Sequence, residues 1–250
     1  MAEPQFVKKN ILEAAITTAT DARAAESAGA DRLELCSVLE VGGVTPSLGT
    51  FLDVREAVRI PVYVLLRPRP GGFVYCNDEF ATIRRDAEWF LNNGASGIVC
   101  GILDAEGRID RARCVELAAM AKGNVVFHRA FDFLPDRFAA LEELIDLGFE
   151  RILTSGGAAT AAEGAEKIAR LMDRAAGRIE ILPAGGIGPQ NVEELIKITG
   201  CNQVHGSFRG PIVSEVSHGL AAQMGVSVRI EPERVREMRI LLDQRGVDFV

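Results

Sequence analysis

The sequence has few cysteines, and they are not arranged in a pattern typical of a disulfide framework or a metal-binding motif. Five cysteines are scattered over 250 residues, at positions 36, 76, 100, 114 and 201, and no two of them form a C-x-x-C pair. An odd number of widely spaced cysteines is typical of reduced thiols, since disulfide-rich domains usually carry an even number. Any metal or redox role must therefore rest on individual cysteines.

The chain also lacks an excess of basic residues and a long apolar run. Its net charge is −7, so it offers no basic surface for a nucleic acid, and no stretch approaches the roughly 18 apolar residues of a membrane span. Its first ten residues lack the charged-then-apolar pattern of a signal peptide. We therefore expect a cytoplasmic protein without a nucleic-acid or membrane partner. The 48% hydrophobic content suffices for one large core.

Glycines and apolar runs recur along the chain at a long, regular spacing. Four times a glycine that is placed to end a helix precedes a short apolar run, at Gly29, Gly94, Gly148 and Gly200. Successive glycines are more than 50 residues apart, about twice the length of one strand-plus-helix unit. Each interval therefore has room for one further strand.

The apolar runs predict eight strands that alternate with helices. The strands are expected at residues 11–17, 33–36, 61–66, 98–100, 124–128, 152–154, 179–183 and 203–205. Apolar residues at steps of three and four predict helices at 21–28, 48–58, 79–91, 110–121, 136–147, 161–175 and 190–199. This order predicts one closed (β/α)₈ barrel over residues 1–250. Residues 226–250, with a helix at 233–243, are expected to form a C-terminal helical extension that covers a barrel end or packs on a partner.

Polar residues gather where the predicted strands end, and in such a barrel those ends line the site. Glu34 and Cys36 share the inward face of their strand by its two-residue period. His128 and His205 end two other strands, and with Glu34 and Asp132 they form a candidate acid–base or metal-binding group. A lone histidine at a strand end is more often a hydrogen-bonded structural group. The third histidine of the chain, His218, is expected at the surface.

A second group of residues at the strand ends predicts an anion site. Two glycine pairs, Gly156 with Gly157 and Gly185 with Gly186, follow neighbouring strands and present backbone N–H groups before helices. Fork-shaped donors and a hydroxyl accompany them, in Arg67, Arg69, Arg129 and Ser155. The alternatives are that the glycines only allow sharp turns and that the arginines pair with barrel carboxylates.

Several ordered motifs resemble those of the CutC family, which is named for a link to copper homeostasis. They are ADRLELCS at 30–37, GVTPS at 43–47, RPR at 67–69, FHRAFD at 127–132, LTSG at 153–156 and VH at 204–205. The resemblance implies a cytoplasmic, homo-oligomeric (β/α)₈ barrel associated with copper. It carries over to Glu34, Cys36, Arg67, Arg69, His128, Arg129, Asp132 and His205.

The chain departs from the family pattern in its first strand, which has Ala15 and Thr17 in place of a cysteine and a polar residue. Gly72 likewise replaces an aspartate. Cu(I) prefers thiolates, and strand order places Cys76 and Cys100 beside Cys36, so these three are the candidate copper ligands. An isolated buried cysteine is, however, most often a small hydrophobic residue.

Two hypotheses for the function follow. The first is a copper-associated protein that binds Cu(I). The second is an enzyme that acts on a small phosphorylated or carboxylated substrate, with acid–base residues and an anion cradle at the barrel mouth. The sequence predicts that the mouth binds an oxyanion in preference to a transition metal.

Overall fold

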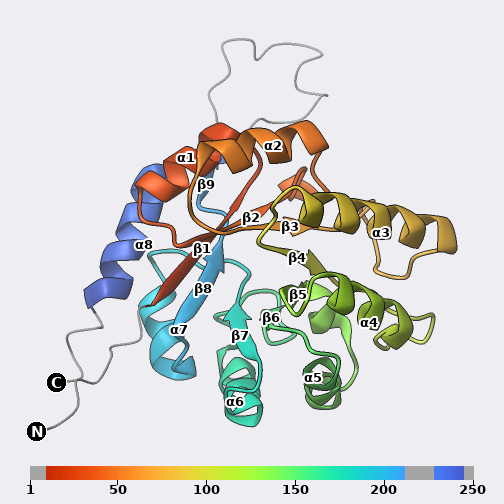
Figure 1. Cartoon of the computed structure of the whole chain (residues 1–250). Helices are drawn as coiled ribbons and strands as arrows, with labels where there is room; N and C mark the ends of the chain where they lie inside the picture. The colour runs from red at the N-terminus through yellow and green to blue at the C-terminus, as the bar shows by residue number, and fades with distance from the viewer. Residues whose placement is uncertain (1–9, 212–227, 245–250) are drawn as a thin grey trace, which may run out of the picture.

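The eight predicted strands are present and run parallel in the order of the chain. The computed structural model describes residues 10–211 and 228–244 (Figure 1). The strands are β1 (Ile11–Ile16), β2 (Arg32–Leu35), β3 (Val62–Leu65), β4 (Gly97–Cys100), β5 (Val125–Phe127), β6 (Arg151–Thr154), β7 (Glu180–Pro183) and β8 (Gln203–Gly206). The predicted alternation of strands and helices is confirmed.

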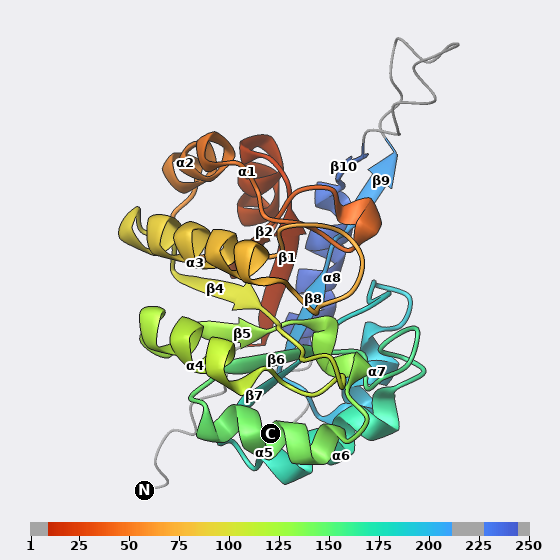
Figure 2. The same cartoon turned by 90° about the vertical axis from the view of Figure 1, so that its right-hand side faces the viewer.

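A helix follows each strand and covers the outside of the barrel (Figures 1 and 2). Side-chain oxygens of Thr18, Ser47, Asp110 and Asp136 accept backbone N–H groups at four of the helix starts, which explains why these starts lie close to their predicted positions. The helices are α1 (Ala19–Ser27), α2 (Leu48–Ala57), α3 (Asn77–Asn92), α4 (Arg111–Met120), α5 (Arg137–Asp146), α6 (Ala165–Ala175), α7 (Val192–Thr199) and α8 (Pro232–Gln244).

Helix α8 is the C-terminal helix that the sequence predicted at 233–243. It packs against both α1 and α7, with Val235, Met238 and Leu242 buried in the common core. It therefore completes the ring of helices between α7 and α1. A short antiparallel pair, β9 (Arg209–Pro211) and β10 (Val228–Ile230), lies between β8 and α8. The rest of the predicted extension, and His218, lie outside the described residues.

The barrel is nearly closed, whereas the sequence predicted full closure. Backbone hydrogen bonds join all neighbouring strands except β7 and β8. Backbone N–H groups of a strand point alternately to its two neighbours. The N–H groups of Glu180 and Ala184 donate toward β6, so the backbone nitrogen of Pro183 points toward β8. Proline has no N–H to donate there. Side chains bridge this seam instead, because Gln203 Nε2 donates to Glu180 Oε2 at 3.2 Å.

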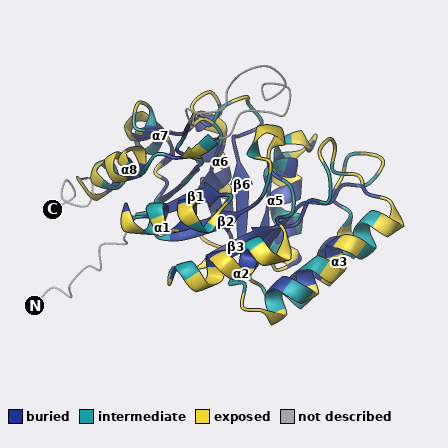
Figure 3. Cartoon of the chain, turned by 90° about the horizontal axis from the view of Figure 1, so that it is seen from above, coloured by how far each residue is buried: buried dark blue, intermediate teal, exposed yellow. Residues whose placement is uncertain are grey.

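Side chains inside the barrel form layers from alternate strands, because the strands are tilted. The strand register places Glu34, Val99, Leu153 and His205 in one layer. The next layer toward the carboxyl ends of the strands holds Ala15, Leu65, His128 and Ala184. Figure 3 shows the buried strands at the centre and the helices with their exposed outer faces around them. Two of the four residues in the upper layer are alanines, which leaves a hollow above Glu34 and His205.

No helix in the described ranges is both long and apolar enough to cross a bilayer.

Candidate functional site

A cavity of about 820 Å³ opens at the carboxyl ends of the strands. Its floor reaches Glu34 and His205, past the small side chains of Ala15 and Ala184. The structure therefore brings the predicted residues Glu34, His128 and His205 together at one mouth. Other predicted residues that border this cavity are Cys36, Arg67, Arg129, Gly185 and Gly186.

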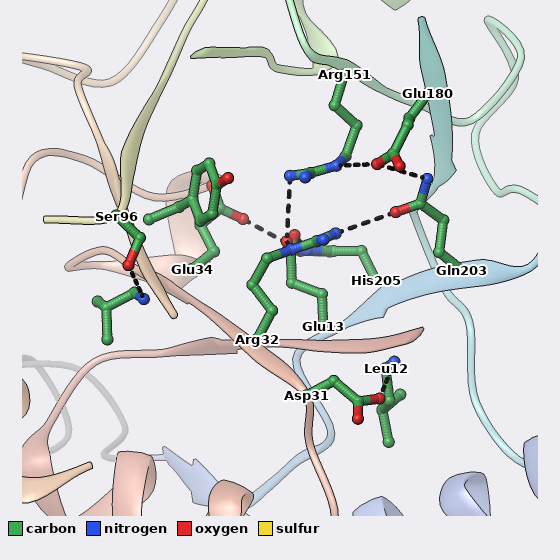
Figure 4. Close-up of polar contacts among 12 residues, drawn as sticks. Leu12, Glu13, Asp31, Arg32, Glu34, Ser96, Arg151, Glu180, Gln203 and His205 are labelled. Carbon is green, nitrogen blue, oxygen red and sulfur yellow. Dashed lines mark hydrogen bonds and ion pairs between the residues drawn. The ribbon is translucent and has the colours of Figure 1, made fainter. Parts of the chain in front are cut away.

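The cavity floor carries a histidine between two carboxylates (Figure 4). His205 Nδ1 lies 2.8 Å from Glu13 Oε1, and its Nε2 lies 3.3 Å from Glu34 Oε2. The strand register sets this geometry, because β1 pairs with β8 on one side and with β2 on the other. All three side chains are buried, so neither carboxylate is solvated as it would be at a surface.

Their surroundings give the two carboxyl groups opposite pKa shifts. Burial raises the pKa of Glu34 to about 7, against a smaller lowering by His205. Burial acts in the same direction on Glu13, but Arg32, His205 and Arg151 together hold the pKa of Glu13 below its ordinary value. Burial disfavours the charged form of His205, yet its contacts with Glu13 and Glu34 raise its pKa. Glu34 thus changes protonation near neutral pH, whereas Glu13 stays ionised.

A buried ionic network supports Glu13 from below, and we did not predict it. Arg32 Nε pairs with Glu13, and Arg32 Nη2 donates to Gln203 Oε1 at 3.1 Å. Arg151 Nη1 lies 3.8 Å from Glu13, and its Nε donates to Glu180 at 3.0 Å. The sequence did carry a signal for this network. Arg32 lies two residues before Glu34, and Glu13 lies two residues before Ala15, so the two-residue period of a strand puts both charged side chains on the inward face.

His128 and Arg67 line the opposite side of the cavity. Ala130 N–H donates to His128 Nδ1 at 3.1 Å, and burial, with the charge of Arg67, lowers the pKa of His128 to about 3. His128 is therefore a neutral imidazole. Arg67 donates to the backbone carbonyls of Val41, Gly43 and Gly71, so it joins two loops over the mouth.

The glycine turn after β6 does not face a substrate anion, contrary to our expectation. The backbone N–H groups of Ser155 and Gly157 donate to the carboxylate of Asp132, at 3.1 and 3.0 Å, and Gly156 N–H donates to Thr154. Asp132 also accepts from Arg129 Nε at 2.9 Å. An internal carboxylate thus fills the cradle, and Asp132 is fully engaged in holding it. The predicted catalytic role of Asp132 has no support in these contacts.

The turn after β7 differs from the turn after β6 in the partners of its N–H groups. Gly185 and Gly186 line the cavity, and within the described residues their N–H groups have no hydrogen-bond acceptor. Arg129 lies beside them, since a Cβ on Gly185 would lie 3.2 Å from Arg129 Nη1. The second predicted cradle is therefore accessible from the cavity. Its role in anion binding stays a prediction.

Arg69 lies away from the cavity lining. Its guanidinium pairs with Glu79, at the start of α3, and donates to Val74 O at 2.9 Å. The alternative interpretation, in which the arginine pairs with a carboxylate of the protein, therefore applies to Arg69. We had expected that carboxylate on a strand of the barrel, but Glu79 lies on a helix.

The three candidate copper ligands do not come together. Cys36 is buried on the cavity wall, Cys76 is exposed at the start of α3, and Cys100 faces outward into the core between strands and helices. Strand order had placed these thiols close to one another. Cys100 sits instead beside Cys114, and burial raises the pKa of both.

The residues present fit a soft metal poorly. Among the cysteines in the described ranges, only Cys36 borders the cavity, and burial raises the pKa of its thiol, which disfavours the thiolate that Cu(I) prefers. Ligand atoms of Glu13, Glu34 and His205 lie within 4.8 Å of one another and could hold a metal ion. These oxygen and nitrogen donors suit Cu(II) or Zn²⁺ better than Cu(I).

Fold and site together define a (β/α)₈-barrel protein with an open cavity at its carboxyl-terminal mouth, in which charged side chains lie among apolar ones. Residues 10–210 match the model of the CutC family, and the chain belongs to that family. A family protein CutC of Treponema denticola is 49% identical over 199 residues, covering 79% of this chain and 81% of that protein. The human copper homeostasis protein cutC homolog is 43% identical over 200 residues, covering 80% of this chain and 73% of that protein. The crystal structure of the putative copper homeostasis protein CutC from Streptococcus agalactiae superposes with a TM-score of 0.75 at 33% identity, covering 79% of this chain and 98% of that one.

Proposed function

We propose that this chain binds a small organic anion, a phosphate or carboxylate ester or acid, in the barrel mouth and transfers a proton within it. The observation that carries the proposal is the buried pair of Glu34 and His205 on the floor of a cavity whose rim holds free backbone N–H donors and guanidinium groups. The cavity therefore has positively charged and N–H donor groups at its rim and an acid–base pair at its floor. The anionic end of a ligand is attracted at the rim, and its reacting end reaches the floor.

The floor has what a general acid–base group needs. A carboxyl with a pKa near the working pH gives and takes a proton at comparable rates, and burial gives Glu34 this property. Glu13, held ionised by Arg32 and Arg151, orients His205 and stabilises its charged form. The two carboxylates therefore have separate roles, Glu34 in proton transfer and Glu13 in positioning.

Solvent exchange into ligands tests the proton transfer without knowledge of the reaction. We would incubate the protein in D₂O with a panel of phosphorylated and carboxylated carbonyl compounds and follow the loss of C–H signals by proton NMR. We expect exchange with the parent and loss of at least a hundredfold in rate with Glu34→Gln, which keeps the shape of the side chain but cannot take the proton. Equal exchange rates in the two proteins would refute the role of Glu34.

Binding of inorganic phosphate tests the rim. Gly185 has φ +103° and lines the cavity, whereas Gly177 has φ +77° with open space around it and lies outside the cavity lining. Both substitutions to valine introduce a similar backbone strain, but only Gly185→Val should abolish phosphate binding in calorimetry. Retained affinity in a folded Gly185→Val variant would count against this part of the rim.

Copper binding is the second candidate, favoured by the family and by the Glu13, Glu34 and His205 group. We propose that any ion held there is Cu(II) and not Cu(I), because the donors are oxygen and nitrogen atoms. Arg32 and Arg151 already balance the charge of Glu13, which opposes a further cation. We also predict a homo-oligomer and a cytoplasmic location, both from the family resemblance.

A further inference from the structure

Three buried polar atoms without hydrogen-bond partners belong to one side of the barrel mouth. They are Arg67 Nε, Tyr75 Oη and His128 Nε2, three of only six such side-chain atoms in the described residues. The three residues are between 4 and 6% exposed. Arg67 acts electrostatically on both Tyr75 and His128, so it lies close to each. The Tyr75 hydroxyl is both donor and acceptor, and Arg67 also acts on it as a hydrogen-bond donor, so the two groups can satisfy each other in part. His128 Nε2 and Arg67 Nε are donors only, and leaving such buried donors unpaired is costly, which indicates a missing acceptor.

The donor state of His128 follows from its contacts. Its Nδ1 accepts the N–H of Ala130, so in the neutral imidazole the proton is on Nε2. Arg67 is held by three backbone carbonyls through its Nη atoms, which leaves Nε without any partner and one further N–H on Nη2. Arg67 also has no carboxylate partner among the described residues, and its positive charge is therefore uncompensated there.

Phe73 covers these donors. The centroid of its ring lies 4.9 Å from the centroid of the His128 ring and 5.2 Å from the central guanidinium carbon, Cζ, of Arg67. Phe73 is only half-buried and lines the cavity with Gly72 and Val74. A small rotation of this side chain would open a route from the cavity to the two N–H groups.

The register of the strands places His128 one layer nearer the mouth than the acid–base pair, on the other side of the barrel, because β5 lies opposite β1. His128 belongs to the layer of Ala15 and Ala184, above the layer of Glu34 and His205. Gly101 leaves room for the ring, since a Cβ there would lie 2.4 Å from His128 Nδ1 and Cε1. His128, Glu34 and His205 line the same cavity, so one ligand that spans it can contact His128 on one side and Glu34 on the other.

We propose that His128 Nε2–H and Arg67 Nε–H bind the carbonyl oxygen of the substrate, so that the substrate is a phosphorylated or carboxylated carbonyl compound with an acidic C–H next to the carbonyl. This inference rests on the proposed function. The Glu34 carboxylate takes the proton, the C–H electron pair forms the C=C bond of an enolate, and the carbonyl π pair moves to the oxygen. The two N–H groups stabilise that oxygen, and the proton on Glu34 returns to a carbon of the enolate. A neutral imidazole can stabilise an enolate in this way without giving up its own proton.

The test compares two probes, 2-phosphoglycolate and methyl phosphate, by isothermal titration calorimetry. The carboxylate of phosphoglycolate carries a charged oxygen where the enolate oxygen would form. We expect the parent to bind 2-phosphoglycolate at least tenfold more tightly than methyl phosphate. A difference of this size corresponds to one or two hydrogen bonds to a charged oxygen. The variant His128→Phe should lose this preference and keep its affinity for methyl phosphate. His128→Gln, which can still donate an N–H, should keep part of the preference.

NMR of the parent gives an answer even if His128→Phe fails to fold. The proton on His128 Nε2 should shift downfield with phosphoglycolate and not with methyl phosphate. The inference would be overturned if the parent bound the two probes with equal affinity and the His128 Nε2 proton did not shift. It would also be overturned if an ordered water were the only acceptor of the His128 and Arg67 N–H groups. If deuterium exchange still depends on Glu34 in that case, the proposed function survives. Failure of both probes to bind, with no exchange, would overturn both proposals.

Discussion

The pKa of Glu34 makes the stability of the barrel depend on pH in a direction that one substitution can test. Burial raises this pKa from 4.5 to about 7 in the folded chain. Between these two pH values the folded state holds a proton that the unfolded chain releases. The free energy of unfolding therefore falls as the pH rises through this window, and above it the loss due to Glu34 is complete and no longer changes with pH.

The size of the effect follows from the two pKa values. Their separation corresponds to about 3 kcal/mol, since one pKa unit is about 1.4 kcal/mol. Glutamine cannot ionise, so Glu34→Gln should keep at pH 8 the stability that the parent loses. For a chain of this length the difference is roughly 6–12 °C in the midpoint of thermal unfolding. His205, whose pKa is raised, adds a loss of stability in the same direction above pH 6.5.

Thermal unfolding at pH 4.5 to 8.5 measures this difference. We expect the midpoint of the parent to fall relative to Glu34→Gln as the pH rises from 4.5 to 7.5, and the gap to stay constant at higher pH. Glu40→Gln is a matched control, because Glu40 is an exposed glutamate at the same mouth with a side chain that is 52% exposed. It should follow the parent. Parallel curves for the parent and Glu34→Gln would show that folding does not raise the pKa of Glu34, and the proton-transfer role would lose its basis.

Three further substitutions test other parts of the site. Gly101→Ala places a Cβ against the ring of His128 and should destabilise the fold by about 1–3 kcal/mol while weakening phosphoglycolate binding; unchanged thermal unfolding would contradict the packing. Asp132→Asn removes the charge that the N–H of Ser155 and its neighbours surround, and we expect a loss of about 2–3 kcal/mol in urea unfolding, whereas a neutral result would reopen that cradle to a ligand. Cys36→Ser should leave the affinity for Cu(I) unchanged in titration against a competing chelator, because the other thiols lie elsewhere; a tenfold loss would restore the thiol site.

Much of the fold follows from local patterns in the sequence. The strands follow from apolar residues at every second position, and the helices from apolar residues at steps of three and four. Helix starts also depend on capping residues such as Ser47 and Asp136. All of these signals come from residues close together in the chain. The carboxyl ends of parallel strands meet at one mouth, so residues at those ends, Glu34, His128 and His205, could be assigned to a common site. A polar residue in an apolar strand also marks its inward face, as it does for Glu34.

Contacts between distant strands decided the rest. Cys100 lies in a short strand that is apolar on both faces, so its pattern does not tell which face points inward. The pairing of Asp132 with the N–H groups after β6, and of Arg67 with carbonyls of two loops, depends on how loops from different strands meet. The sequence by itself determined the barrel and the mouth at which its polar residues collect. Only the tertiary structure decided which of them are paired with the protein, because their partners are set by strand register and tilt, and which remain free for a ligand.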